Sequence, residues 1–253
     1  MLLTPTMIGF YLIVVFAATV QTAIGFGSTL VCVTLGANLF DIEQVVHWIV
    51  PVSFLQTGYV LVTDRREIQW AFLLKRVLPW MIAGVVGGLA IVSVFKGPIL
   101  GFAFGVIVLA LTVRDLHEQS KRSADSGSSL NRFQSTIAML AAGVMHGMFA
   151  SGGPMLVYAL GREGLDKHAF RATLSVVWFT LNIILVGQFV RAGVYDRENL
   201  KILAALSLSV FAGVVVGDWL HHRVDEKRFR IAVLGLLCAA AISLVLRYGR
   251  QLF

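Results

Sequence analysis

Met148 to Leu156 reads MFASGGPML, and this segment lies inside an apolar stretch long enough to form a membrane helix. Its centre, Ser151-Gly152-Gly153-Pro154, is a poor sequence for continuing a helix. Each glycine costs about 1 kcal/mol relative to alanine, and proline lacks the amide that donates within a helix. We therefore expect a helix to break here. A break at membrane depth is costly, so it requires a reason in packing or function.

The composition of the chain indicates a lipid environment. Of its 253 residues, 57% are hydrophobic and 14% are charged, and the mean hydropathy is +0.81. Soluble domains carry about 25% charged residues. The charges are separated by apolar stretches free of Asp, Glu, Lys and Arg, most of them near the ~20 residues that cross a hydrocarbon core: Met7–Asn38, Val45–Thr63, Val77–Phe95, Gly97–Val113, Phe133–Gly161, Ala172–Val190, Ile202–Gly217 and Ile231–Leu246. The fold class expected is an all-α polytopic membrane protein.

Several other classes are disfavoured by the same residues. The formal net charge of +7 comes from Lys and Arg that cluster in loops flanking the spans, where anionic lipid headgroups account for them and a nucleic-acid partner does not. Cys32 and Cys238 lie inside apolar stretches and show no metal-ligand or disulfide spacing. We expect no cofactor and no metal. The lipid bilayer is the partner that the composition implies, and a homo-oligomer is left open.

The chain divides into two similar parts. A polar, Ser-rich segment, 117–131, separates a first part, 1–116, from a second part, 132–253. The stretch IGFGSTLV (24–31) aligns with ASGGPMLV (150–157), and AGVVGG (83–88) aligns with AGVVVG (212–217). Gly, Val and Leu are common in membrane helices, so each short match alone can arise by chance. Because the matches keep their order at nearly constant offset, we interpret them as an internal duplication.

Each repeat therefore opens with a broken apolar stretch, which either crosses the membrane once or returns as a re-entrant hairpin. The hairpin arrangement collects more of the Lys and Arg residues on one side of the membrane, and the positive-inside rule favours it. It also leaves an odd number of crossings in the rest of each half, so the two repeats would have inverted topology. Inverted repeats with discontinuous helices are typical of secondary transporters.

The two breaks are the expected binding site. Irregular backbone at membrane depth is tolerated where it is buried in protein or lines a wet cavity, and the start of a helix presents amide donors with a positive dipole end. Two such ends near the midplane form a site for an anion. The candidate residues at the breaks are Gly25, Gly27, Ser28, Thr29, Ser151, Gly152 and Gly153.

Polar residues deeper in the spans complete the candidate site. Gln56 and Asn182 occur at the same offset as the two broken stretches, so they either line a pocket or bond between helices. His146 precedes the second break. It binds an anion or a coupled proton in one interpretation and bonds across a helix interface in the other. His47 stands at the start of its span and is interpreted as interfacial.

An intramembrane serine hydrolase is the alternative of another class. Ser151-Gly152 would supply a nucleophile, but Phe149 stands where a rhomboid-type motif has glycine, and the later helix lacks its histidine. No phosphate-binding loop is present either, which argues against direct coupling to ATP within this chain.

The two Gly-rich breaks, IGFGSTLV and HGMFASGGPMLV, followed by the glycine-spaced AGVVGG and AGVVVG helices and a closing helix ending in Arg, resemble the sulfite exporter TauE/SafE family of bacterial inner-membrane permeases. The resemblance implies transport of small sulfur-containing or organic anions, such as sulfite, sulfoacetate or other organosulfonates. The first break departs from the pattern, with Phe26 between its glycines and no proline. Carboxylate and sulfonate groups accept the same amide donors, so a small-carboxylate permease is the nearest alternative.

Overall fold

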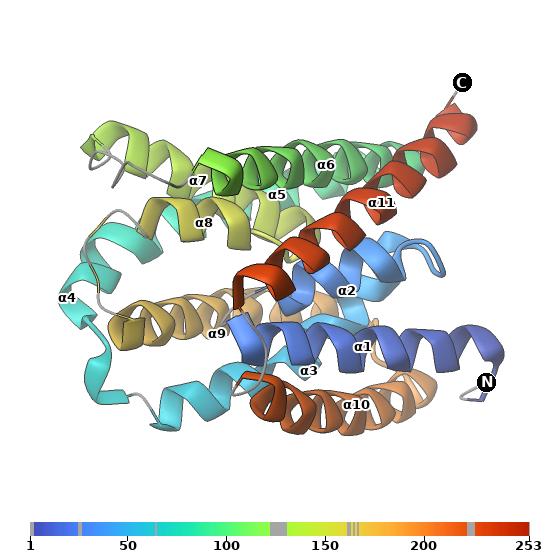
Figure 1. Ribbon diagram of the computed structural model, residues 1–253. Coiled ribbons are helices and arrows are strands. Elements are labelled where there is room, and N and C mark those ends of the chain that lie inside the picture. Colours follow the sequence, from blue (N-terminus) through green and yellow to red (C-terminus); the bar gives the residue numbers. More distant parts are fainter. Residues whose placement is uncertain are drawn as a thin grey trace. The chain divides into compact units, whose positions relative to one another are not determined.

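The computed structural model describes residues 3–24, 27–63, 65–121, 131–160, 163, 165, 167–221 and 226–252, and these residues form helices and short connections without a strand (Figure 1). The elements follow one another as α1 (Pro5–Ile24), α2 (Ser28–Gly36), α3 (Ile42–Thr63), the 3-10 turn η1 (Arg65–Glu67), α4 (Trp70–Phe72), the π-helical turn η2 (Leu73–Val77), α5 (Leu78–Val94), α6 (Pro98–Lys121), α7 (Arg132–Phe149), α8 (Gly153–Leu160), α9 (Lys167–Arg191), α10 (Arg197–His221) and α11 (Glu226–Leu252). The all-α prediction is confirmed.

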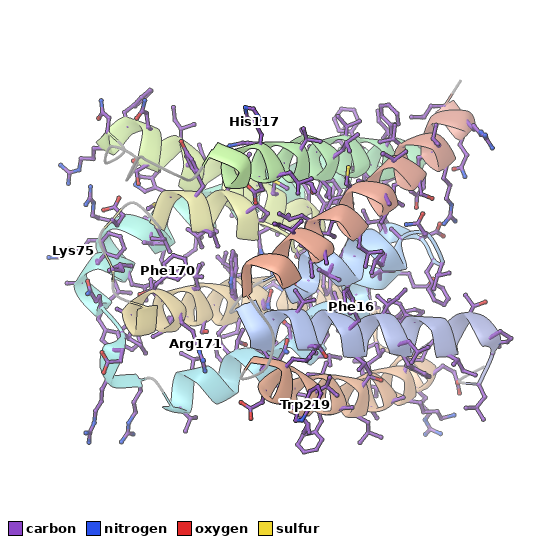
Figure 2. All side chains as sticks on the ribbon, in the orientation of Figure 1. Phe16, Lys75, His117, Phe170, Arg171 and Trp219 are labelled. Atoms are coloured by element: carbon purple, nitrogen blue, oxygen red, sulfur yellow. The ribbon has the colours of Figure 1, made fainter. Side chains whose placement is uncertain are left out.

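Six segments of the described chain are long and apolar enough to cross a membrane. They are Pro5–Thr22, Trp70–Val94, Pro98–His117, Ala169–Arg191, Arg197–Leu220 and Ile231–Leu252. Many of their exposed side chains are large and apolar. On α10, Leu208, Phe211 and Trp219 are each more than half exposed, and Trp219 projects away from the ribbon (Figure 2). Such a surface is stable against hydrocarbon and unstable in water, so the chain is a multi-pass membrane protein.

The helices group into two compact units, each assembled from both halves of the sequence. Unit 1 contains 1–46, 94–126 and 204–253, and unit 2 contains 47–93 and 127–203. Within the segment 117–131, α6 continues to Lys121, and residues 122–130 lie outside the described part of the chain.

In unit 1, the glycines of α10 allow close contact with α1. A Cβ added to Gly213 would lie 2.6 Å from Cβ of Ala18, and one added to Gly217 would lie 2.6 Å from Cβ of Thr22. The hydroxyl of Thr19 crosses the same interface and donates to the Gly213 carbonyl at 3.1 Å. Small residues that admit a neighbouring backbone are the usual device for joining helices in lipid. The two helices run side by side in Figure 1.

In unit 2, α5 uses its glycines in the same way against α7. A Cβ added to Gly84 would lie 2.8 Å from Cα of Gly143, and one added to Gly88 would lie 3.0 Å from Cα of Gly147. Gly87, on another face of α5, would meet its nearest atom at 3.8 Å. The glycine-spaced segments 83–88 and 212–217 therefore each pack against the helix that precedes a break.

A proline in α3 ties this helix to the α9–α10 connection. Pro51 lacks an amide hydrogen, so the carbonyl four residues earlier, that of His47, receives no helical hydrogen bond. The Tyr195 hydroxyl donates to that carbonyl at 3.2 Å, and the Trp48 indole donates to Oδ1 of Asn199 at 2.8 Å. Burial raises the pKa of Tyr195 to about 12. The connection therefore supplies the hydrogen bonds that keep the start of α3 in place.

Candidate functional site

In the second half of the chain, a short connection separates α7 from α8. Helix α7 ends at Phe149, and the next residue, Ala150, has a left-handed backbone with φ of 52° while its amide donates to the His146 carbonyl at 2.7 Å. Ser151 is 2% exposed, and its hydroxyl donates to the Phe149 carbonyl at 3.0 Å. Helix α8 then begins at Gly153. The connection is thus held by its own hydrogen bonds.

A chain of buried polar side chains lies beside this connection. Nε2 of His146 is 3.0 Å from Oδ1 of Asn182, and Nδ2 of Asn182 is 2.8 Å from Oγ of Ser53. The Ser53 hydroxyl reaches the Val50 carbonyl at 2.6 Å. All three side chains are buried, with His146 2% and Asn182 3% exposed. They come from α7, α9 and α3, so the cluster joins three helices of unit 2.

The Val50 carbonyl at the end of this cluster fixes the direction of every hydrogen bond in it. A carbonyl oxygen can only accept, so the Ser53 hydroxyl donates its hydrogen to Val50 and its oxygen accepts from the Asn182 amide. The Asn182 oxygen then faces His146, whose Nε2 must carry the hydrogen. In a neutral imidazole, Nδ1 is consequently a bare acceptor. This buried Nδ1 has no hydrogen-bond partner among the described residues.

Trp178 lies against this cluster, and Gln56 and Thr57 lie near Ser53 on α3. The indole of Trp178 stacks on the His146 ring, with centroids 5.2 Å apart and planes at 19°. Gln56 is buried on α3, three residues after Ser53 and so close to the same helix face. Thr57, one turn after Ser53, donates to the Ser53 carbonyl at 3.1 Å.

The two glycines of the connection have different surroundings. A Cβ added to Gly152 would collide with the Ala142 carbonyl oxygen and lie 3.2 Å from Cβ of His146. A Cβ added to Gly153 would meet no described atom within 4 Å. Gly152 is therefore required for the close approach of the connection to α7, whereas Gly153 borders open space at the start of α8.

The break in unit 1 is built differently. Helix α1 ends at Ile24 and α2 begins at Ser28, preceded by Gly27 with a left-handed φ of 103°. The amide of Ser28 donates to Oε1 of Gln21 at 3.2 Å, and its hydroxyl donates to the same oxygen. Thr29 follows in the first turn of α2 and is partly exposed. Gly25 lies outside the described residues.

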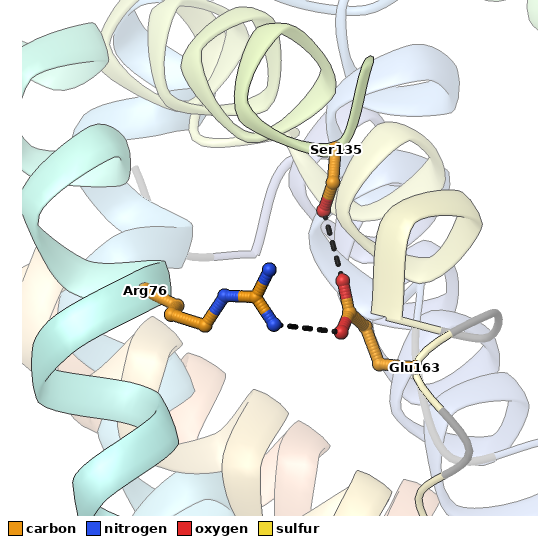
Figure 3. Close-up of polar contacts among 3 residues, drawn as sticks. All are labelled: Arg76, Ser135 and Glu163. Carbon is orange, nitrogen blue, oxygen red and sulfur yellow. Dashed lines mark hydrogen bonds and ion pairs between the residues drawn. The ribbon is translucent and has the colours of Figure 1, made fainter. Parts of the chain in front are cut away.

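Unit 2 also holds an ion pair at the far end of α8. The Arg76 guanidinium of η2 is 3.4 Å from one carboxylate oxygen of Glu163, and the Ser135 hydroxyl of α7 donates to the other at 3.0 Å (Figure 3). The Glu163 side chain is 17% exposed and that of Arg76 is 39% exposed. Glu163, three residues after the end of α8, is thereby connected to η2 and α7.

The sequence had identified many of these residues but not their partners. Gln56, His146, Ser151, Gly152, Gly153 and Asn182 all belong to unit 2, and Gly27, Ser28 and Thr29 belong to unit 1. Within unit 2, the structure joins His146 to Asn182. Ser53 was missed. Its spacing of three from Gln56 and four from Thr57, which marks a polar stripe along α3, was the available signal.

The arrangement gives no support to hydrolysis. The Ser151 hydroxyl donates to a backbone carbonyl, and a nucleophilic serine needs a base as its partner. Among the described residues, no three His, Cys, Asp or Glu side chains gather as metal ligands. The polar groups of the cluster are instead neutral hydrogen-bond donors and acceptors in an apolar helical protein.

Residues 10–244 match the sulfite exporter TauE/SafE family, and the chain belongs to that family. It is a membrane transporter and not an enzyme. The chain is similar to the "Probable inner membrane transporter protein TsaS" of Comamonas testosteroni, with 29% identity over 198 residues that cover 77% of this chain and 78% of the relative. No solved structure matches it.

Proposed function

We propose that the protein is a secondary transporter that moves a small sulfur oxyanion, such as sulfite, sulfoacetate or another organosulfonate, across the bacterial inner membrane. The proposed binding residues lie at the two breaks and on the helices beside them: Gly25, Gly27, Ser28, Thr29, Gln56, His146, Ser151, Gly152, Gly153 and Asn182. Membership of the sulfite exporter family supports the substrate class, and similarity to a probable inner membrane transporter supports the choice of membrane.

One observation carries the proposed site. Gly153 opens α8 and borders space that no described atom fills, while the buried His146–Asn182–Ser53 cluster lies at the end of the preceding helix. The first amides of a helix have no acceptor within that helix, and the dipole there favours negative charge. In α8 these donors are the amides of Gly153 and Met155, because Pro154 between them has no amide hydrogen. An oxyanion beside Gly153 would accept hydrogen bonds from them.

We propose two inverted repeats with re-entrant breaks, 1–116 and 132–253, as the architecture of transport, and the symmetry of the helix contacts supports the presence of two repeats. Helix α5 of the first part packs through Gly84 and Gly88 on α7, and α10 of the second part packs through Gly213 and Gly217 on α1. Equivalent helices thus make equivalent contacts in the two units. In secondary transporters built this way, one bundle rocks against the other around a fixed site.

A matched pair of substitutions tests the site. Gly153→Leu fills the space at the start of α8, and Gly187→Leu makes the same change on α9, where an added Cβ also meets no described atom within 4 Å. Purified wild-type protein is heated with sulfite, sulfoacetate, methanesulfonate, acetate or chloride. A ligand at about 100 times its Kd adds about 2.7 kcal/mol of stability.

We expect a sulfur oxyanion to stabilise the wild type and Gly187→Leu but not Gly153→Leu. Stabilisation of all three proteins alike would place the anion elsewhere. Stabilisation by acetate alone would favour a carboxylate permease, and no response to any of the five anions would refute the substrate class.

A further inference from the structure

His146 has a buried hydrogen-bond acceptor, Nδ1, for which a bound anion would not supply a donor. Its Nε2–H donates to Oδ1 of Asn182, and its Nδ1 lone pair has no partner among the described residues. A buried polar atom left without a partner costs about 1–3 kcal/mol. An anion also brings acceptors, so it cannot satisfy this lone pair and would face it unfavourably. A proton on Nδ1 reverses the situation, because Nδ1–H then donates to the anion.

The geometry points to His146 as the proton carrier of the transport cycle, with Nδ1 taking up one proton for each anion bound. This inference rests on the proposed function. The Val50–Ser53–Asn182 chain fixes the Nε2 hydrogen in place, so the added proton goes to Nδ1. The proton comes from water on the side where the anion enters, and the Nδ1–H bond breaks when both are released on the other side.

The positions of the charged side chains support the coupling of one proton to each bound anion. An anion in a low-dielectric site requires a counter-charge, since an isolated buried charge is very costly. The segments packed around His146 place their charged groups at a distance. From Asn182, Arg171 and Arg191 lie about 16 and 14 Å away along α9, at 1.5 Å per residue. Arg132 stands at the start of α7, about 21 Å along that helix from His146.

The remaining titratable side chains on those segments have other positions. His47 lies near the start of α3 with its ring edge-on to Phe189, at 4.5 Å between centroids. Tyr158 is on α8, and Leu78–Val94 of α5 contains no titratable residue. A protonated His146 is therefore the nearest available positive charge on the described part of these helices, and the stacked Trp178 ring also favours an imidazolium over its face.

The test compares His146→Gln with His47→Gln in proteoliposomes of the full chain. The amide nitrogen of glutamine takes the position of Nε2 and keeps the bond to Asn182, but it cannot bind a proton at neutral pH. Labelled methanesulfonate is the probe, because it stays ionised throughout the pH range, and sulfite is run in parallel. A pH gradient of one unit drives about tenfold accumulation at one proton per anion.

We expect wild type and His47→Gln to accumulate the anion on the alkaline side, and His146→Gln to bring it only to equal concentrations. Accumulation by His146→Gln at the wild-type level would overturn the inference. Wild-type transport indifferent to the pH gradient would also overturn it while leaving the proposed function intact. No transport of either anion by the wild type would refute the proposed function itself.

A second measurement covers the case in which His146→Gln does not fold. Wild-type protein in weakly buffered detergent solution is mixed with methanesulfonate or sulfite, and proton uptake is followed at neutral pH. Uptake equal to the amount of methanesulfonate bound supports the inference. Binding of methanesulfonate without proton uptake would contradict it.

Discussion

Replacing Gly84 by alanine should separate two helices, whereas the same change at Gly87 should not. A methyl group at Gly84 would collide with the Leu140 carbonyl oxygen and lie 2.8 Å from both Cα of Gly143 and the amide nitrogen of Val144. These atoms belong to the backbone of α7, which cannot rotate out of the way as a side chain can. At Gly87, the nearest atom is a Val144 methyl at 3.8 Å, an ordinary contact distance.

The size of the effect follows from two opposing terms. Alanine is favoured over glycine inside a helix by about 1 kcal/mol, and both variants gain this. Overpacking costs about 1–3 kcal/mol, and only Gly84→Ala incurs it. The free energy of unfolding should therefore differ between the two variants by about 1–3 kcal/mol.

Thermal unfolding of the two variants in the same detergent measures this difference. Gly84→Ala should unfold at a lower temperature than Gly87→Ala, by about 2–4 °C per kcal/mol for a chain of this size. Equal melting temperatures, or a more stable Gly84→Ala, would refute the close α5–α7 contact and with it the argument that glycine spacing sets this interface.

Three further predictions concern single residues. Asn182→Ala leaves the Nε2 hydrogen of His146 without its acceptor, and we expect the free energy of unfolding to fall by about 1–3 kcal/mol in chemical denaturation; a loss below about 0.5 kcal/mol would contradict the buried cluster. Because the folded-state pKa of Tyr195 is raised from 10.0 to about 12, the folded protein holds this proton where the unfolded chain loses it. Its contribution to stability is full below pH 10 and declines as the pH rises from 10 towards 12. Tyr195→Phe should reduce that decline in melting temperature, and an unchanged profile would count against the assignment. Glu163→Gln should lower stability by about 1 kcal/mol or less, since Arg76 is part exposed, and 1 M salt should narrow the gap between variant and wild type in a melting experiment; a gap that widens with salt would exclude an ion pair.

Local sequence was sufficient for the features that depend on neighbouring residues. The run Ser151-Gly152-Gly153-Pro154 predicted a helix boundary, and α7 and α8 are separate helices on either side of it. The glycines of 83–88 recur at helical intervals, a pattern typical of close helix packing, and Gly84 and Gly88 meet the backbone of α7. Both outcomes follow from backbone properties of glycine and proline, which act wherever these residues occur.

The finer roles depended on tertiary contacts and could not be predicted. The left-handed residue at the second break is Ala150, not a glycine, whereas Gly152 lies where the connection approaches the Ala142 carbonyl. Ser53 becomes a partner of Asn182 only because α3 and α9 pack together. The ion pair of Arg76 with Glu163 joins residues far apart in the chain, and the sequence alone does not show that they are close in space.

Uptake of labelled sulfite into liposomes that contain the purified protein tests the central claim most directly, that an anion is carried past the start of α8. The account predicts saturable uptake by the wild type and by Gly187→Leu, and strongly reduced uptake by Gly153→Leu at equal amounts of folded protein. Uptake by Gly153→Leu at the wild-type rate would contradict it.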